Sequence, residues 1–290
     1  MPELPEVETI RAGLAKRVAG RVIEKAEGGG GRLTRNNPGG VAQVRQSLTG
    51  ATVIRIERRG KFMWWVLDGP DESLVVHLGM SGQVRTSSPK RQTDLHKHEH
   101  LRLTLDDGTL VHFVDPRMFG HLTLSPLETD KRGRQIPKVA SHIAPDLLEF
   151  DAESDLLELA STVASRHRMI KPMLLDQSVV SGIGNIYADE GLHAAKVHGT
   201  QVGSEITEET ALAVIRACGA VMTRAMQVGG TSFDSLYVDV EGNPGYFARQ
   251  LSVYHREDRP CPRCGDTIRR SVIQGRAHYS CPSCQSAPGR

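Results

Sequence analysis

The sequence lacks the features that mark membrane and secreted proteins. No stretch approaches the roughly 18 consecutive apolar residues that a membrane-spanning helix needs. The opening residues, MPELPEVETIR, carry acids and prolines where a secretory signal would carry basic residues and then an apolar run. The chain also shows no internal repeats and no low-complexity tract, and its 39% apolar share is ordinary for a globular protein. We therefore expect a folded cytoplasmic protein without a membrane partner.

The chain also lacks a strong excess of charge of one sign. Its net charge of +2 says little about partners by itself. The distribution is more informative, because residues 249–290 hold eight arginines and three acids, a net charge of +5. The guanidinium group can hold a phosphate through two hydrogen bonds, so this basic end suits a polyanionic partner. A solvated, arginine-rich face is the alternative interpretation.

The length and the order of patterns predict several domains in an α+β protein. A chain of 290 residues is too long for one small core. A β-rich domain with a leading helix is expected first, then a linker with prolines and scattered charges, then a helical domain and a zinc finger. We place these regions at residues 1–127, 128–150, 151–248 and 249–290.

The first region is predicted to be β-sandwich-like. Its leading helix is indicated by apolar residues at helical spacing, namely Val7, Ile10, Leu14 and Val18. The pattern then changes to strands, which we predict at residues 52–58, 62–67, 74–78, 100–105 and 110–114. The turn Asp106-Asp107-Gly108 marks the last two strands as a hairpin.

The third region has helical patterns that glycine-containing turns interrupt. Residues 170–175 continue a helical segment, and Ser181–Asn185 separates it from a helix at 186–195. Thr207 caps a final long helix that ends at Gly229-Gly230.

Four of the five cysteines form a metal-binding pattern. Two Cys-x-x-Cys pairs, separated by sixteen residues, consist of Cys261, Cys264, Cys281 and Cys284. Such pairs bring four thiolates to one tetrahedral zinc and leave room for a β-hairpin between them. A redox pair or two disulfides are the alternatives, and a reducing cytoplasm disfavours disulfides. A four-thiolate site has no open position, so we predict one structural Zn²⁺. The fifth cysteine, Cys218, is expected as a buried free thiol.

Motifs along nearly the whole chain resemble the formamidopyrimidine-DNA glycosylase family. Besides the zinc hairpin, the most specific segments are Pro2–Glu8, Gly60–Phe62, His77–Gly82, Asp115–Gly120, Lys171–Asp176 and Ser181–Asp189. The resemblance implies a bifunctional DNA glycosylase and abasic-site lyase of base excision repair. Such an enzyme removes 8-oxoguanine and formamidopyrimidines from damaged double-stranded DNA and nicks the strand by β,δ-elimination. It also implies that residues 1–127 form the catalytic domain and that the helical domain is a helix–two-turns–helix domain. We further expect the protein to be a monomer.

The resemblance assigns the catalytic roles to Pro2, Glu3, Glu6 and Lys61. Removal of Met1 would give Pro2 a free amine with a pKa of about 8, so more of it is neutral at pH 7 than of a lysine. Attack of a secondary amine on the sugar gives an iminium ion, which promotes strand cleavage. Glu3 would be the general acid, Glu6 would order the region, and Lys61 would contact phosphate or sugar. The residues alone also allow an interpretation without catalysis. In it, these residues only begin a helix, and the acids stabilise the positive end of its dipole.

The resemblance also implies two groups of DNA contacts. The gap left by an extruded base would be filled by Met80, Arg117 and Phe119. Contacts to the DNA backbone are implied for Lys171, Asn185 and Arg276, and His77 is counted among the DNA-binding residues. The segment 231–250 matches the region that covers an extruded 8-oxoguanine in the family.

Two other functions remain open at this point. Endonuclease VIII-like enzymes, which prefer oxidised pyrimidines, open with Pro-Glu-Gly-Asp, whereas this chain has Pro-Glu-Leu-Pro-Glu at residues 2–6. A zinc-ribbon DNA-binding protein without catalysis is the second alternative. The joint presence of the implied catalytic and DNA-contacting residues favours the enzyme over this alternative.

Overall fold

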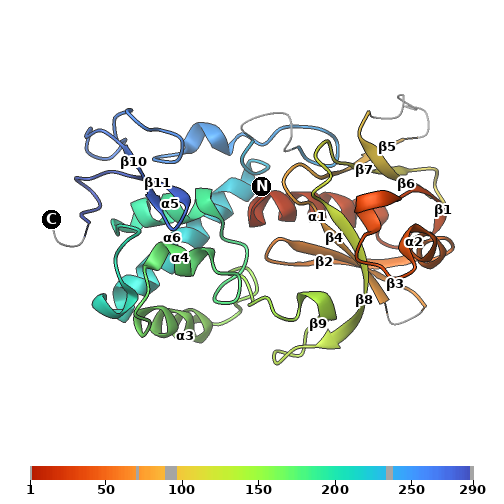
Figure 1. The fold of residues 1–290 in the computed structure, drawn as a ribbon, viewed down its shortest axis with the longest axis horizontal. Helices are drawn as coiled ribbons and strands as arrows, with labels where there is room; N and C mark the ends of the chain where they lie inside the picture. The colour runs from red at the N-terminus through yellow and green to blue at the C-terminus, as the bar shows by residue number, and fades with distance from the viewer. Residues whose placement is uncertain (1, 70–71, 89–96, 233–237, 288–290) are drawn as a thin grey trace. The chain divides into compact units, whose positions relative to one another are not determined.

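The computed structural model describes residues 2–69, 72–88, 97–232 and 238–287. Contacts divide the chain into two units, whose elements are labelled in Figure 1. The first unit comprises Met1–His142 and Val228–Tyr246, and the second comprises Ile143–Gln227 and Phe247–Arg290. Segment 228–246, which we grouped with the preceding helices, thus contacts mainly the first unit. The combination of helices and sheets confirms the predicted α+β class.

The first unit consists of a leading helix and two antiparallel sheets. Helix α1 spans Leu4–Val18, and a shorter helix, α2, spans Gly40–Leu48. One sheet has the order β1-β6-β7-β5, formed by Ile23–Gly28, Glu99–Leu105, Leu110–Val114 and Gln83–Ser87. The other has the order β2-β3-β4-β8-β9, formed by Val53–Arg59, Phe62–Leu67, Glu72–His77, His121–Thr129 and Gln135–Pro137. Short 3₁₀ turns lie at Gly31–Thr34 and Lys138–Ala140.

One apolar core joins α1 to both sheets. The helix contributes the four residues predicted from its spacing, Val7, Ile10, Leu14 and Val18. Each such side chain contributes roughly 1.5–3 kcal/mol when it is fully buried, so this face holds α1 in place. Strand β3 buries both of its faces, because Met63 and Trp65 enter this core whereas Trp64 and Val66 enter a second cluster. Burial on both faces explains the unbroken apolar run of β3.

The five predicted strands are all present, with their ends within two residues of the predicted ones. The sequence analysis missed α2, β1, β5, β8 and β9. Helix α2 has nine residues and buries only Val44 and Leu48 fully. Two buried residues are too few for a helical repeat of apolar residues to be recognised in the sequence. Strand β8 contains Pro126 and runs into the region that we expected to be a linker, where proline argues against a strand.

The second unit is helical and ends in a two-stranded hairpin. Its helices α3, α4, α5 and α6 span Glu153–Ala164, Ile170–Leu175, Asn185–Ala195 and Glu208–Gln227. The hairpin strands β10 and β11 are Arg269–Ile273 and Arg276–Ser280, and 3₁₀ turns lie at Gly203–Glu205 and Phe247–Gln250. A Cβ atom on Gly191 would lie 2.3 Å from Cys218 Sγ, so α5 and α6 pack closely. Cys218 is a buried free thiol, as predicted. Among the described residues, no helix combines the length and apolarity that crossing a membrane requires.

Candidate active site and metal centre

Two buried carboxylates organise the start of α1. Glu3, the residue that precedes α1, is 4% exposed, and Glu6 is 7% exposed. Glu6 Oε2 accepts a hydrogen bond of 2.8 Å from the amide of Glu3, and Glu6 Oε1 accepts one of 2.7 Å from the amide of Thr231. Glu6 therefore connects the helix start, where Pro2 lies, to segment 228–246.

Glycines allow this segment to approach α1 closely. Gly230 has φ of +85°, and a Cβ atom there would lie 3.0 Å from Glu6 Oε1. A Cβ atom on Gly245 would lie 2.3 Å from the carbonyl oxygen of Gly230, so the two ends of the segment pass backbone to backbone. Further along, Val240 fits against Gly13 of α1, where a Cβ atom would lie 2.7 Å from Val240 Cγ2. Residues 233–237 of the predicted lesion-covering segment 231–250 lie outside the described residues.

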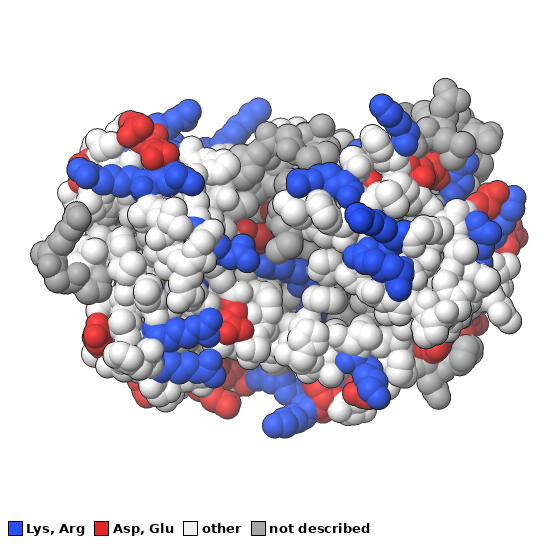
Figure 2. All heavy atoms as spheres, in the orientation of Figure 1, with Lys and Arg blue, Asp and Glu red and all other residues white. Residues whose placement is uncertain are grey.

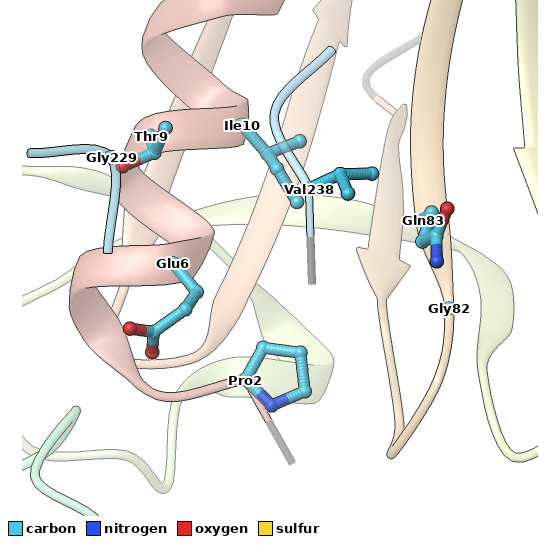
Figure 3. A pocket seen from close by; sticks show the side chains of 8 residues that line it. All are labelled: Pro2, Glu6, Thr9, Ile10, Gly82, Gln83, Gly229 and Val238. Atoms are coloured by element: carbon cyan, nitrogen blue, oxygen red, sulfur yellow. The ribbon is translucent and has the colours of Figure 1, made fainter. Parts of the chain in front are cut away.

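Pro2 forms part of the wall of a hollow in the first unit. In Figure 3, Pro2 and Glu6 lie on one side of the hollow and Gln83 lies on the other, with Val238 between them. The hollow has an empty volume of about 300 Å³, which includes space open to solvent. The Pro2 ring thus lines this hollow together with Glu6 of the same helix start.

Arg58 joins α1 to the turn that carries Lys61. This turn connects β2 to β3 and includes Gly60, whose φ is +55°. Arg58 is 6% exposed; its Nε donates to Glu8 Oε2 at 3.0 Å and its guanidinium donates to the carbonyl of Gly60 at 3.0 Å. Burial opposes ionisation of Glu8, but the hydrogen bonds from Arg11 and Arg58 outweigh it and lower the pKa of Glu8.

His77 lies in a row of rings at the end of the five-stranded sheet. Its ring centroid is 4.8 Å from that of Phe62 and 4.9 Å from that of His121. Burial lowers the pKa of His77 to about 4, with further contributions from the positive charges of His121, Lys61 and Arg35. The amide of Gly79 donates to Nδ1 at 3.1 Å, which assigns the ring proton of neutral His77 to Nε2. His77 is therefore a neutral hydrogen-bond donor at pH 7.

The structure brings the three predicted gap-filling residues onto two adjacent loops. Met80 lies in the loop 79–82 and is 39% exposed. Phe119 lies in the loop 115–120 and is 45% exposed, with the Arg117 guanidinium carbon 5.2 Å from its ring centroid. A Cβ atom on Gly79 would lie 2.5 Å from the carbonyl carbon of Phe119, so the two loops touch through their backbones.

Asp115, to which the sequence analysis assigned no role, connects these two loops. Its carboxylate is buried, with the residue 1% exposed. Oδ2 accepts a 2.7 Å hydrogen bond from the amide of Gly120, and Oδ1 accepts from Ser81 Oγ at 2.5 Å and from the amide of Arg117 at 3.2 Å. The Asp-Pro step at a strand end was the available signal, because aspartate there commonly closes a turn through its own side chain.

In the second unit, Lys171 is fully buried. Its Nζ donates to Asp189 Oδ1 at 2.7 Å and to the carbonyl of Ala277 at 2.6 Å. Asn185 Nδ2 donates to the same carbonyl at 2.9 Å. Lys171 and Asn185 thus meet at the residue after Arg276, which is itself exposed. The family resemblance implies a contact of Lys171 with the DNA backbone, and in the structure its ammonium group is buried inside the protein.

Asp189, which the sequence analysis also left without a role, joins α4 and α5 to β11. Besides Lys171, its carboxylate accepts from the amide of Tyr279 at 3.0 Å and lies 2.6 Å from His278 Nδ1. Asp189 and His278 are both completely buried. Their separation of 89 residues explains why no sequence motif indicated the contact.

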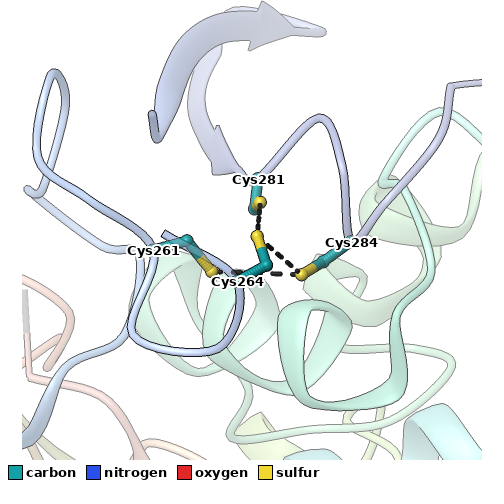
Figure 4. Close-up of side chains that lie close together, drawn as sticks. All are labelled: Cys261, Cys264, Cys281 and Cys284. Atoms are coloured by element: carbon teal, nitrogen blue, oxygen red, sulfur yellow. Dashed lines mark hydrogen bonds between the residues drawn. The ribbon is translucent and has the colours of Figure 1, made fainter. Parts of the chain in front are cut away.

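The four predicted cysteines form one cluster (Figure 4). Their sulfur atoms all lie within 4.8 Å of one another. Four thiolates at about 2.3 Å from one zinc would be about 3.8 Å apart, so the cluster fits a tetrahedral ion. His193 Nε2 lies 3.4 Å from Cys261 Sγ, and burial, followed by the charge of Arg263, lowers the pKa of His193 to about 4. A neutral histidine can donate to a thiolate and orient it. The cluster confirms the predicted site for one structural Zn²⁺.

The hairpin that follows the first cysteine pair carries exposed arginines. The side chains of Arg269, Arg270 and Arg276 are exposed on β10 and β11. On the face drawn in Figure 2, Lys and Arg side chains project from both units, with Asp and Glu among them. The basic residues that the composition indicated are therefore available to an anionic partner.

Comparisons with known families match most of the chain. Residues 1–122 match the formamidopyrimidine-DNA glycosylase N-terminal domain, and residues 143–236 match the formamidopyrimidine-DNA glycosylase H2TH domain. Residues 259–287 match a zinc finger found in these glycosylases and in isoleucyl-tRNA synthetases. The helix–two-turns–helix domain and the zinc finger implied by the sequence motifs are thus confirmed.

Relatives and solved structures agree with this assignment. The formamidopyrimidine-DNA glycosylase of Rhodococcus opacus is 47% identical over 100% of this chain and 99% of that protein. The glycosylase of Nocardia farcinica is 45% identical, with 100% of both chains covered. A Lactococcus lactis mutant enzyme in complex with Fapy-dG-containing DNA is 31% identical, with a TM-score of 0.82 over 99% of this chain and 100% of that one. The same enzyme with DNA containing an abasic site gives a TM-score of 0.81 at 31% identity, over 98% and 100%. This chain belongs to the formamidopyrimidine-DNA glycosylase family.

Proposed function

We propose that this protein, a base excision repair glycosylase, removes oxidised purines from double-stranded DNA and then nicks the strand through abasic-site lyase chemistry. The names of its relatives and the damaged DNA bound to the Lactococcus lactis enzyme support this substrate class. The observation that carries the proposal is the position of Pro2 in the wall of a hollow, directly before the buried carboxylates of Glu3 and Glu6.

In the proposed first step, the amine of Pro2 attacks C1′ of the damaged nucleotide. The base leaves with the electron pair of the glycosidic bond and takes up the proton that the amine loses. Glu3 donates a proton to the sugar ring oxygen as the C1′–O4′ bond opens, which leaves an iminium ion between C1′ and the nitrogen. Loss of a C2′ proton then expels the 3′ phosphate, and a second elimination expels the 5′ phosphate. Glu6 keeps the helix start and segment 228–246 in position.

Two groups of residues are proposed to hold the DNA. Met80, Arg117 and Phe119 would enter the gap that the extruded base leaves. Backbone contacts are proposed for Lys61, His77, Asn185 and Arg276. Because Lys171 is buried, we propose that it acts indirectly, by fixing the carbonyl of Ala277 next to Arg276.

The remaining proposals concern assembly and location. One chain carries all the proposed catalytic and DNA-contacting groups, which favours a monomer. A DNA substrate places the protein in the compartment of the chromosome, the bacterial cytoplasm.

Borohydride trapping with a duplex that contains 8-oxoguanine opposite cytosine tests this function. Borohydride reduces the iminium ion to a stable amine, so we expect a covalent adduct that mass spectrometry places on Pro2. The matched control is a protein preparation that retains Met1, whose blocked amine should bind the duplex without forming an adduct. An adduct formed only with an oxidised pyrimidine would indicate endonuclease VIII-like specificity. Binding without any adduct would contradict the enzymatic proposal.

A further inference from the structure

We propose that Asp115 and Ser81 are positioning residues that hold Met80, Arg117 and Phe119 as one preformed wedge. The inference rests on the proposed function of these three side chains at the extruded base. It adds a buried connection to them, made of residues that touch neither the DNA nor the reacting atoms.

The carboxylate of Asp115 reaches both loops at once. Through Oδ1 it accepts the hydroxyl of Ser81, which follows Met80, and the amide of Arg117. Through Oδ2 it accepts the amide of Gly120, which follows Phe119. Arg117 therefore bonds to this carboxylate through its own amide. Met80 and Phe119 each directly precede a residue that bonds to it. Burial of the carboxylate strengthens these bonds, because hydrogen bonds to a charged acceptor gain from a low local dielectric.

The backbone of Asp115 is itself fixed to the four-stranded sheet. The amide of Asp115 donates to the carbonyl of His98 at 3.0 Å, and the carbonyl of Asp115 lies 2.8 Å from His100 Nε2. His98 directly precedes β6 and His100 lies at its start, next to the end of β7. Asp115 thus connects the ends of the two inner strands of this sheet to the two loops.

Backbone contacts leave the loops little freedom to separate or rotate. A Cβ atom on Gly120 would lie 3.0 Å from Asp115 Oδ2, and one on Gly82 would lie 2.4 Å from the carbonyl oxygen of Leu78. From the other side, the Arg35 guanidinium donates to the carbonyls of Phe119 and Gly120 at 3.2 and 3.0 Å. With their backbones held in this way, Met80 and Phe119 present their side chains outward, 39% and 45% exposed.

A preformed wedge lowers the cost of extruding a base. Side chains that are already ordered lose less conformational entropy when they enter the base stack, which favours the extruded state. The preformed wedge therefore lowers the free-energy cost only of the step that removes a base from its pair. Nicking at an abasic site needs no such extrusion, so it should depend much less on Asp115 and Ser81.

The test compares Ser81→Ala with the matched control Ser73→Ala. Ser73 is also fully buried and donates a 3.0 Å hydrogen bond to the carbonyl of Ser125, but it connects β4 to β8 and not the two loops. For Ser81→Ala we expect release of 8-oxoguanine opposite cytosine to slow about 10-fold, the order expected for loss of one hydrogen bond to a charged group. Nicking of an abasic duplex should change by less than about twofold, and Ser73→Ala should match the wild type on both substrates.

A second variant, Asp115→Asn, keeps the shape of the side chain and removes its charge. We expect the same selective loss, larger than for Ser81→Ala. Equal losses on both substrates, or similar behaviour of the Ser73 and Ser81 variants, would overturn the wedge proposal while leaving the enzymatic function intact. A wild-type protein that neither releases the base nor forms the borohydride adduct would overturn the proposed function and the wedge with it.

Discussion

At the scale of single residues, the site depends on groups whose surroundings set their charge. His77 combines burial with three nearby cationic or ionisable groups, and its pKa falls to about 4. The pKa of His121 is also lowered, first by burial and then by Arg35. Lys61 and Arg35 therefore supply the positive charge of this corner, while His77 supplies a directed hydrogen bond.

This shift makes the stability of the protein depend on pH in a defined direction. In the unfolded chain the pKa of His77 returns to 6.5, so between pH 6.5 and 4 the unfolded state binds a proton that the folded state does not. The free energy of unfolding must fall as the pH falls through this window, by at most about 3 kcal/mol from His77. Urea unfolding at several pH values should show a smaller fall for His77→Gln. Identical pH profiles for the two proteins would refute the assignment.

At this scale, a site could be predicted from the sequence where its residues are closely spaced along the chain. The four cysteines form two local pairs, and their cluster could be predicted from that spacing alone. The contacts of Asp115 with Ser81 and of Asp189 with His278 could not, because these partners lie 34 and 89 residues away and only the fold brings them together. The burial of Lys171 was likewise not indicated by the sequence, because lysines are rarely buried and its partner Asp189 lies on another helix.

At the scale of elements, apolar periodicity predicted α1 and the central strands because their packed faces are long. It failed for short or interrupted elements such as α2 and β8. The β10–β11 hairpin has a different origin, because metal binding and a few buried polar contacts order it. Its small cluster of buried residues includes the zinc ligands Cys261 and Cys281 themselves.

Loss of one zinc ligand should therefore disorder the hairpin and remove its part in DNA binding. We expect Cys281→Ser to lose zinc and to bind DNA at least about 10-fold more weakly, because structural zinc contributes much of the folding energy of such modules. Metal analysis and a binding titration on the same samples would measure both effects. Cys218→Ala is the control, since Cys218 is distant in sequence from the cluster and should leave zinc in place. Unchanged binding by metal-free protein would contradict the prediction.

At the scale of the whole molecule, affinity for DNA should depend on salt through the number of phosphates that the protein contacts. Each lost phosphate contact lowers the slope of log affinity against log salt by about 0.9. The proposed direct contact of Arg276 and the indirect role of Lys171 therefore give different results.

We expect Arg276→Gln to weaken binding and to lower this slope by about 0.9. Lys171→Gln should also weaken binding, because it removes the ammonium group that bonds both Asp189 and the carbonyl of Ala277, yet its slope should equal that of the wild type. Titrations at four or more salt concentrations measure the slopes, and zinc content verifies that both variants are folded. A reduced slope for Lys171→Gln would instead place its ammonium group on a phosphate.

The return of segment 228–246 to the first unit has a consequence for synthesis of the protein on the ribosome. Glu6 emerges early, but its partner Thr231 follows 225 residues later. At bacterial translation rates this interval is on the order of 10–50 s. During that time the helix start that carries Pro2 lacks one of its fixed neighbours, and the second unit is translated in between. The nascent chain therefore cannot complete the proposed active site at Pro2 until most of the polypeptide has been made.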